Sequence, residues 1–419
     1  MDRRSFVGGM TTATVSALSG CSSLFSRSDP SIEPLVTDAD WQTFGHDIQN
    51  TNTTPSAPPT PPITQDWVFS TRGNISTRPL VTKDIVILGD SKGYVYGIDQ
   101  NTGRKQWQFQ TKKLIGDYYI STTPLIRGNS IYVASSDWHL YALNMESGQK
   151  RWAKRIGEIL TPLIGSQNTI IGAGQQGNDR GRLFIINSDD GTIRWNLLLP
   201  NRPISMGLYP NKHVYLLDAK GNLFVYDTTN GNRQWKTDLS LIHEGQQVSI
   251  PTVTENYIIF LVSQRRFNQT RVILVNRKSG KLAWTYPVPG ALHPNKIAVQ
   301  NNRLVAITAD KHEYVIKEDD SPDKDDQSPK TTITIVDIAN RKIVHQQTVP
   351  TRVEGGPLIA NKTVLFKTQE QLHAFDVLSG ESVWSTRHHL RGGEFPFTVA
   401  YESLFYPRNQ SMLKLSSKN

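Results

Sequence analysis

One short motif recurs along this chain and constrains its fold more than any other feature. It first occurs at Asp99-Gln-Asn-Thr102-Gly103-Arg-Lys-Gln-Trp107: an Asp or Asn, usually a Thr or Ser before a Gly, and a Trp eight residues after the first position. Later copies end at Trp152, Trp195, Trp235, Trp284 and Trp384, and a degenerate copy that begins at Asp337 ends at His345. Seven copies in one chain indicate a repeat protein.

Each copy predicts a tight hairpin between two strands. An apolar run precedes it, and the side chain of the Asp or Asn is suited to accept hydrogen bonds from the backbone of the turn. The Gly takes the positive-φ position that most residues avoid. The Trp then opens the outgoing strand with a large apolar surface to bury. Unrelated hairpins are the alternative, but six of the nine Trp residues share this one register.

The two ends of the repeat array are incomplete in complementary ways. The segment 66–70 predicts a strand that carries Trp67 but has no hairpin motif before it. At the other end, Ser403–Tyr406 and Met412–Leu415 predict two strands with no Trp strand to follow. If the Trp67 segment pairs with the last of these, residues 66–419 divide into eight units of about 44 residues. We therefore predict an all-β fold, an eight-bladed β-propeller of four-stranded blades whose ring is closed by an N-terminal strand. An open solenoid of hairpins is the alternative.

The N-terminus resembles an export signal. Arg3 and Arg4 precede a Phe and a short apolar stretch, which ends at Leu18-Ser19-Gly20-Cys21. This pattern resembles a twin-arginine signal joined to a lipoprotein processing box, which implies cleavage before Cys21 and lipid on its side chain. We expect residues 1–20 to be removed and the mature protein to be anchored at the outer face of the cytoplasmic membrane, at the cell surface or in the periplasm. A plain cytosolic N-terminus and an uncleaved anchor are the alternatives.

Residues 21–65 are expected to form a tether and a lead-in to the propeller domain, residues 66–419. The first part is polar and rich in Ser, which favours a flexible linker. Trp41-Gln-Thr-Phe44-Gly45-His46-Asp47 comes next, followed by five prolines between positions 55 and 62. Prolines favour an extended chain, and we expect Trp41 and Phe44 to pack on the flank of the propeller.

Composition and charge narrow the range of partners. The 419-residue chain is 37 % hydrophobic, and its formal net charge of +9 permits contact with acidic partners or anionic lipid heads. Its basic residues are scattered, so nucleic-acid binding is not expected. A lone cysteine, Cys21, excludes an internal disulfide framework. Arg78, Arg202 and His293 precede predicted inner strands, and we hypothesise that they form a basic ring for a protein partner at one mouth of the central channel. Scattered solvated side chains are the alternative.

The repeat resembles that of pyrroloquinoline-quinone (PQQ) propellers. The copies ending at Trp107, Trp152 and Trp384 are similar to the family pattern Ala-x-Asp-x-x-Thr-Gly-Lys-x-x-Trp, and the similarity extends from about residue 66 to the C-terminus. In this family the Trp residues dock neighbouring blades, a role that the resemblance implies for Trp67, Trp107, Trp152, Trp195, Trp235, Trp284 and Trp384. The family contains quinoprotein dehydrogenases, the propeller lipoprotein of the outer-membrane β-barrel assembly machinery, and lipid-anchored surface propellers with a similar Trp-x-x-Phe-Gly-x-Asp lead-in.

The resemblance implies two functional classes. Alcohol-oxidising relatives hold PQQ and Ca²⁺ beside a catalytic Asp and a disulfide of adjacent cysteines, whereas this chain has only Cys21 and no evident carboxylate and amide set. Some sugar-oxidising relatives lack the disulfide, so a PQQ-dependent dehydrogenase acting on an alcohol or sugar remains the alternative. We favour a non-catalytic scaffold, without cofactor or metal, that binds an unidentified protein or a surface glycan. The acidic segment 317–330 lacks EF-hand spacing and is interpreted as a solvated loop.

Overall fold

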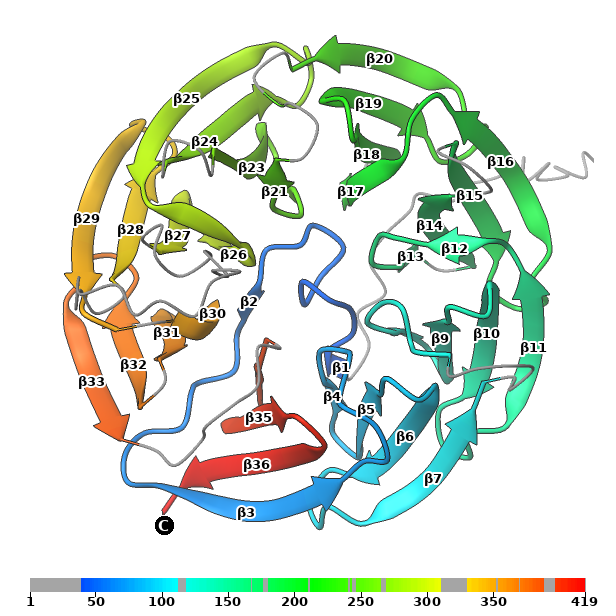
Figure 1. The fold of residues 1–419 in the computed structure, drawn as a ribbon, viewed down its shortest axis with the longest axis horizontal. Helices are drawn as coiled ribbons and strands as arrows, with labels where there is room; N and C mark the ends of the chain where they lie inside the picture. The colour runs from blue at the N-terminus through cyan, green and yellow to red at the C-terminus, as the bar shows by residue number, and fades with distance from the viewer. Residues whose placement is uncertain are drawn as a thin grey trace, which may run out of the picture. The chain divides into compact units, whose positions relative to one another are not determined.

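A computed structural model describes most of the chain as one continuous array of strands. The described residues are 39–111, 118–166, 168–175, 180–209, 212–239, 242, 246–264, 269–309, 330–351, 353–368, 370–387 and 396–418. Every regular element in these ranges is a β-strand, and the strands form eight sheets arranged as a ring (Figure 1). The predicted eight-bladed β-propeller is confirmed. No helix in the described ranges is long and apolar enough to cross a membrane.

Blades one to four each begin with a strand at the channel and step outwards through antiparallel neighbours. Blade one contains β4 (Leu80–Thr82), β5 (Ile85–Gly89), β6 (Tyr94–Asp99) and β7 (Lys105–Gln110), and blade two contains β8 (Leu125–Arg127), β9 (Ser130–Ala134), β10 (His139–Asn144) and β11 (Lys150–Arg155). Blade three contains β12 (Glu158–Ile159), β13 (Ile164–Ser166), β14 (Thr169–Gln175), β15 (Gly181–Asn187) and β16 (Ile193–Leu199). Blade four contains β17 (Pro203–Tyr209), β18 (His213–Asp218), β19 (Asn222–Asp227) and β20 (Arg233–Asp238).

Blades five to eight follow the same plan, and two strands of the lead-in add to the array. Blade five contains β21 (Gln247–Val248), β22 (Thr252–Val253), β23 (Tyr257–Gln264), β24 (Gln269–Asn276) and β25 (Leu282–Pro289), and blade six contains β26 (Ala291–Gln300), β27 (Arg303–Ala309), β28 (Thr331–Asp337) and β29 (Lys342–Val349). Blade seven contains β30 (Val353–Ala360), β31 (Thr363–Thr368), β32 (Gln371–Asp376) and β33 (Ser382–Arg387), and blade eight contains β34 (Thr398–Ala400), β35 (Ser403–Arg408), β36 (Ser411–Ser417) and β3 (Ile63–Ser70). The lead-in strands β1 (Ala39–Trp41) and β2 (Thr53–Thr54) pair with β4 and β30.

The N-terminal strand β3 closes the ring as predicted. It pairs antiparallel with β36, so that Trp67 lies opposite Lys414 and Val68 lies opposite Leu413. Strands from the two ends of the domain therefore share one sheet, and the outermost position of blade eight is filled. This pairing leaves no gap in the ring, because it joins the first strand of the propeller domain to its last strand.

The repeated motif forms the turn before each outermost strand. At Asp99, the Oδ1 atom accepts hydrogen bonds from the backbone N–H of Asn101 and Thr102 and from the Thr102 hydroxyl. The Gly103 N–H donates to the Asp99 carbonyl, and Gly103 adopts a φ of 70°. These bonds hold the pKa of the Asp99 carboxyl below its usual value. The turn chemistry predicted from the motif is therefore present.

Five Trp residues of the repeat register pack on the Gly of the next blade's turn: Trp67, Trp107, Trp152, Trp195 and Trp235. A Cβ added to Gly103 would stand 2.6 Å from the Trp67 ring, and one added to Gly280 would stand 2.8 Å from the Trp235 ring. Indole N–H groups also donate to carbonyls of the next blade, in the bonds Trp67–Gln100 (3.0 Å), Trp107–Met145 (2.9 Å), Trp152–Ser188 (3.0 Å) and Trp195–Thr228 (3.0 Å). At the seam of blades six and seven His345 replaces the Trp, lies against Gly380, and has a buried Nε2 without a hydrogen-bond partner.

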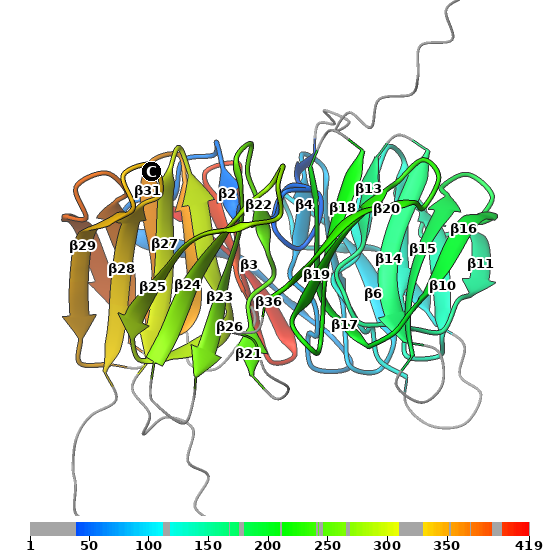
Figure 2. The ribbon, with the colours of Figure 1, turned by 90° about the horizontal axis from the view of Figure 1, so that it is seen from above.

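The antiparallel plan gives the propeller two unlike faces (Figure 2). We call the one that carries the Asp/Asn-Gly turns the hairpin face. The opposite one, which we call the loop face, carries the turns between the second and third strands and the connections from blade to blade. Sites that depend on the repeat turns and sites that depend on the connections therefore lie at opposite ends of the strands.

Candidate functional site

The lead-in crosses the middle of the ring and contacts every blade (Figure 1). It pairs with blade one through β1, contacts blade three through a hydrogen bond from the Thr43 hydroxyl to the Leu163 carbonyl, and accepts the Glu402 N–H of blade eight on the Ser56 hydroxyl. Its carbonyls accept backbone N–H groups from the remaining blades, in the bonds Ile126–Gln42 (2.8 Å), Leu208–Ile48 (3.1 Å), Val253–Gln49 (3.0 Å), Val299–Thr51 (2.8 Å) and Ile359–Asn52 (3.1 Å). The segment 41–56 therefore contacts all eight blades from the middle of the ring, and we call it the plug.

Two asparagines of the plug join neighbouring blades in pairs. Asn50 Nδ2 donates to the carbonyl of Met206 in blade four and to that of Pro251 in blade five. Asn52 Nδ2 donates in the same way to the carbonyls of Ile297 and Pro357 in blades six and seven, at 3.1 and 2.7 Å. Both asparagines adopt left-handed φ values, 56° and 58°, a conformation that Asn tolerates better than most residues. A carboxamide with two N–H donors suits a position between two strands.

Arg78 is buried beneath the plug, only 2 % exposed. Its guanidinium donates to the carbonyl of Phe44 at 2.8 Å, to that of Phe397 at 2.8 and 3.2 Å, and to Asn52 Oδ1. It also lies over the Trp41 ring, 4.1 Å from the ring centroid. Burial lowers the pKa of Arg78 well below its usual value. The hypothesis that Arg78 forms part of an accessible basic ring is corrected, because its donors are used inside the protein.

The other two members of that hypothetical ring are Arg202 and His293. Arg202 precedes β17 on the loop face and its side chain is exposed. His293 lies within β26, and its side chain is outside the described residues. Trp41 also differs from expectation: it is fully buried at the centre of the ring, whereas we expected it on the flank. The predicted export and lipid-attachment residues, Arg3, Arg4 and Cys21, and the acidic segment up to residue 329 lie outside the described residues.

The plug leaves little room in the channel at its own level. A cavity of about 20 Å³ lies beside Phe44, Asn50, Asn52 and Thr252, which is room for about one water molecule. Within the described ranges no three His, Cys, Asp or Glu side chains come together as candidate metal ligands.

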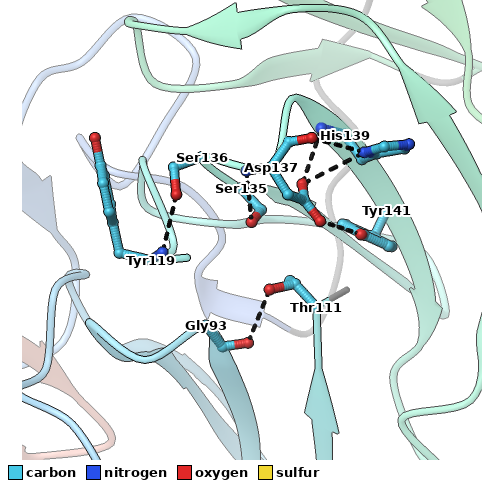
Figure 3. Close-up of polar contacts among 8 residues, drawn as sticks. All are labelled: Gly93, Thr111, Tyr119, Ser135, Ser136, Asp137, His139 and Tyr141. Atoms are coloured by element: carbon cyan, nitrogen blue, oxygen red, sulfur yellow. Dashed lines mark hydrogen bonds and ion pairs between the residues drawn. The ribbon is translucent and has the colours of Figure 1, made fainter. Parts of the chain in front are cut away.

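The loop face of blade two carries a second candidate site, which the sequence did not single out. The turn Ser135-Ser136-Asp137-Trp138 joins β9 to β10, and Trp138 is 49 % exposed with a φ of 69°. Tyr119, in the connection from blade one, is 45 % exposed. The Tyr119 N–H donates to the Ser136 hydroxyl and the Ser136 N–H donates to the Tyr119 carbonyl, at 2.9 and 3.0 Å (Figure 3). The connection and the turn are thus held together.

A buried carboxylate stabilises this turn. His139 and Tyr141 alternate along β10 and so share one face of this strand, and Asp137 lies in the turn two residues before His139. The Asp137 carboxylate accepts hydrogen bonds from the His139 backbone N–H at 3.0 Å and from the Tyr141 hydroxyl, and His139 Nδ1 lies 3.6 Å from it (Figure 3). The Asp137 side chain is 2 % exposed, against 19 % for His139. This cluster therefore fixes the turn and offers no accessible catalytic pair.

Trp41 was expected at the wrong place and Trp138 was not singled out, yet these two residues share one sequence feature. Of the nine Trp residues, only Trp41 and Trp138 lie outside the register of the repeat. Trp41 is buried within the plug and Trp138 lies on the loop face. The two Trp residues outside the repeat register thus lie in the two candidate sites, the plug and the loop-face turn of blade two.

These features define an eight-bladed β-propeller of the PQQ-repeat type, built on turns of Asp or Asn with Gly and closed by an N-terminal strand. The family model described as outer membrane protein assembly factor BamB matches residues 64–159 and 154–386, most of the chain. The chain belongs to this family. The resemblance inferred from the repeat is thereby confirmed.

Individual relatives are distant. BamB from Moraxella catarrhalis superimposes with a TM-score of 0.59 at 14 % identity, covering 85 % of this chain and 98 % of that one. Quinohemoprotein alcohol dehydrogenase ADHIIG from Pseudomonas putida HK5 superimposes with a TM-score of 0.69 at 10 % identity, covering 90 % and 80 %. Tetrathionate hydrolase of Acidithiobacillus ferrooxidans is 24 % identical over 111 residues, 26 % of this chain and 20 % of that protein's length. The two structural likenesses establish the fold alone.

Proposed function

We propose that this chain is an exported, lipid-anchored, non-catalytic propeller that serves as a rigid scaffold for a protein partner at the cell surface or in the periplasm. The observation that carries the proposal is the plug. The central channel is the natural cavity of a propeller, and here the protein's own backbone crosses it and bonds to the blades. About 20 Å³ stays free beside the plug. Binding is then left to the outer faces, where loops on a rigid frame present side chains.

Family membership supports the same proposal. The matching family is described as an outer membrane protein assembly factor, and assembly implies contact with other proteins. The lipid anchor on Cys21 and export through Arg3 and Arg4 are parts of the proposal that rest on the N-terminal pattern. Dehydrogenase activity with PQQ is the competing function, because a quinohemoprotein alcohol dehydrogenase shares the fold.

Two measurements test the proposal. Affinity purification from the membrane fraction after mild cross-linking should recover a discrete protein partner with the tagged wild type. The Cys21→Ser variant, which should not be anchored, should recover less of it. In the second measurement the purified protein is incubated with PQQ and Ca²⁺, and we expect no change in quinone absorbance and no dye reduction with alcohols or sugars. Dye reduction that depends on all three additions would replace the scaffold function with the dehydrogenase.

A further inference from the structure

Blade two departs from blade one at two equivalent positions on the loop face. In blade one, the Asn74 N–H donates to the Ser91 hydroxyl and the Ser91 N–H donates to the Asn74 carbonyl. In blade two, Tyr119 and Ser136 make the same two bonds. The isolated bridges Ile75–Asp90 and Ile120–Ser135 match as well. Tyr119 therefore occupies the place that Asn74 holds in blade one.

Trp138 occupies a place that sister blades give to glycine. The carbonyls of Gly93, Trp138 and Gly221 each accept, at 3.0 Å, the N–H of the residue that follows the outermost strand of their blade. All three residues have positive φ, 75° and 80° for the glycines and 69° for Trp138. This left-handed region strains residues that carry a Cβ. A Trp at this position therefore carries a conformational penalty that Gly would avoid.

The Trp138 ring does not offset that penalty through burial in the fold. It is 49 % exposed, whereas the repeat-register rings Trp67 and Trp107 are each 7 % exposed. At Gly93 an added Cβ would stand 2.6 Å from both the Thr111 hydroxyl and the Tyr118 carbonyl, so in blade one the turn has no space for a side chain. Blade two is open here and presents an indole and, from Tyr119, a phenol to solvent. Exposed aromatic rings on a fixed backbone are typical of binding surfaces.

The charges beside these rings are positive. The Arg155 guanidinium lies over the Trp138 ring, 5.1 Å from its centroid, and the equivalent residue of blade one is the neutral Gln110. Lys92, on the equivalent turn of blade one, and Arg72, in the connection that leads into blade one, are exposed. The carboxylate of the Trp138 turn, Asp137, is buried and accepts its hydrogen bonds from His139 and Tyr141, so it is not exposed beside Arg155. A guanidinium stacked on an indole can still donate to a carboxylate in its plane.

We propose that Tyr119, Trp138 and Arg155 form a docking site for an acidic, extended peptide segment of a partner protein. The Arg155 guanidinium pairs with a carboxylate of the peptide, and the two rings pack against an apolar side chain beside it. Charge complementarity selects this occupant, because Arg155 is an exposed cation at the Trp138 ring and Arg72 and Lys92 are exposed cations on the loop face of blade one. This inference rests on the proposed scaffold function and assigns it a site and a chemical class of partner.

The chain itself supplies the matched variant for the test. Y119N/W138G/R155Q gives blade two the residues of blade one at the three positions and should fold at least as stably as the wild type, because it removes the left-handed Trp. The probe is a fluorescein-labelled peptide of alternating Glu and Leu, measured by anisotropy, with an alternating Lys and Leu peptide as the charge control. Arg202→Glu, an exposed cation on the same face, tests whether positive charge alone is enough.

We expect the Glu-Leu peptide to bind the wild type, the Lys-Leu peptide not to bind, and the triple variant to lose affinity roughly tenfold or more. Arg202→Glu should change affinity less than threefold, by about 0.6 kcal/mol. The proposed site would be wrong if the triple variant bound the Glu-Leu peptide as tightly as the wild type does, or if both peptides bound equally. It would also be wrong if Arg202→Glu lost as much affinity as the triple variant. If the triple variant still recovers the wild-type partner from membranes, this result supports the scaffold function and contradicts the proposed docking site. Recovery of no partner by either protein would count against the scaffold function itself, whatever the peptide result.

Discussion

The role of the plug can be tested at Arg78, the residue that ties it to the first and last blades. Arg78→Met keeps an unbranched apolar side chain of useful length but removes every donor. Three buried acceptors, the carbonyls of Phe44 and Phe397 and Asn52 Oδ1, lose this partner. Each costs roughly 1 kcal/mol or more when left without a donor. Arg78→Met also loses the contact with the Trp41 ring, about 1 kcal/mol, but it no longer buries a charge, and we take these two terms to cancel. The three acceptors without a donor then lower the free energy of unfolding by about 3 kcal/mol.

Urea denaturation followed by circular dichroism measures this loss, and hydrogen exchange shows where it acts. Amides that donate to the plug, such as those of Val299 and Ile359, should exchange faster in Arg78→Met because the plug opens more often. Arg202→Met is the matched control, since its side chain is exposed and its effect should stay within about 0.5 kcal/mol. A loss below about 1 kcal/mol with unchanged exchange at those amides would refute the reasoning.

Four further changes test the rest of the structure. His345→Trp should raise the free energy of unfolding by about 1 kcal/mol by restoring the inter-blade indole; an unchanged or lower thermal midpoint would contradict this. Gly103→Ala should destabilise more than Gly128→Ala in urea, although both have positive φ, because only the Cβ at 103 meets a Trp ring. Hydrogen bonds from the Asn340 backbone and side chain and from Arg303 hold the pKa of Asp337 at about 2. A lowered carboxyl pKa stabilises the fold above about pH 4, and this contribution disappears as the pH falls towards 2. Asp337→Asn should therefore lose less stability across that window than the wild type, and identical acid profiles would argue against the assignment. Cys21→Ser should release the protein into the medium on cell fractionation, and retention in the membrane fraction would exclude the anchor.

The blade count and the closure of the ring followed from the sequence because their causes are local. An Asp or Asn with a Gly specifies a turn within a few residues, and a Trp at constant spacing marks the strand that follows. The unpaired segment of Trp67 and the unfinished C-terminal strands then matched, and the structure pairs Val68 with Leu413. To predict the closure of the ring, it was enough to assign the one unpaired N-terminal strand to the one blade that lacked its outermost strand.

The two candidate sites were less accessible to sequence reasoning. The plug has almost no regular structure, and its hydrogen bonds go to backbone atoms of blades up to 346 residues away, as between Ser56 and Glu402. Backbone acceptors leave no pattern in side-chain identity, so Trp41 was expected on the flank and Arg78 at an open rim. Trp138 could be identified from the sequence, because aligning the repeats places this Trp opposite Gly93. The repeat motif lies in the turns of the hairpin face, so it does not include this position on the loop face.

The sequence by itself determined the repeat, the number of blades and the strand that completes the last one, because hairpin chemistry and Trp spacing act over short stretches of chain. Only the tertiary structure decided what fills the centre of the ring and which side chains the loop face exposes. Those outcomes depend on where eight inner strands converge and on whether a neighbouring connection covers a turn. At Gly93 the next connection covers the turn, and at Trp138 the ring stays open to solvent.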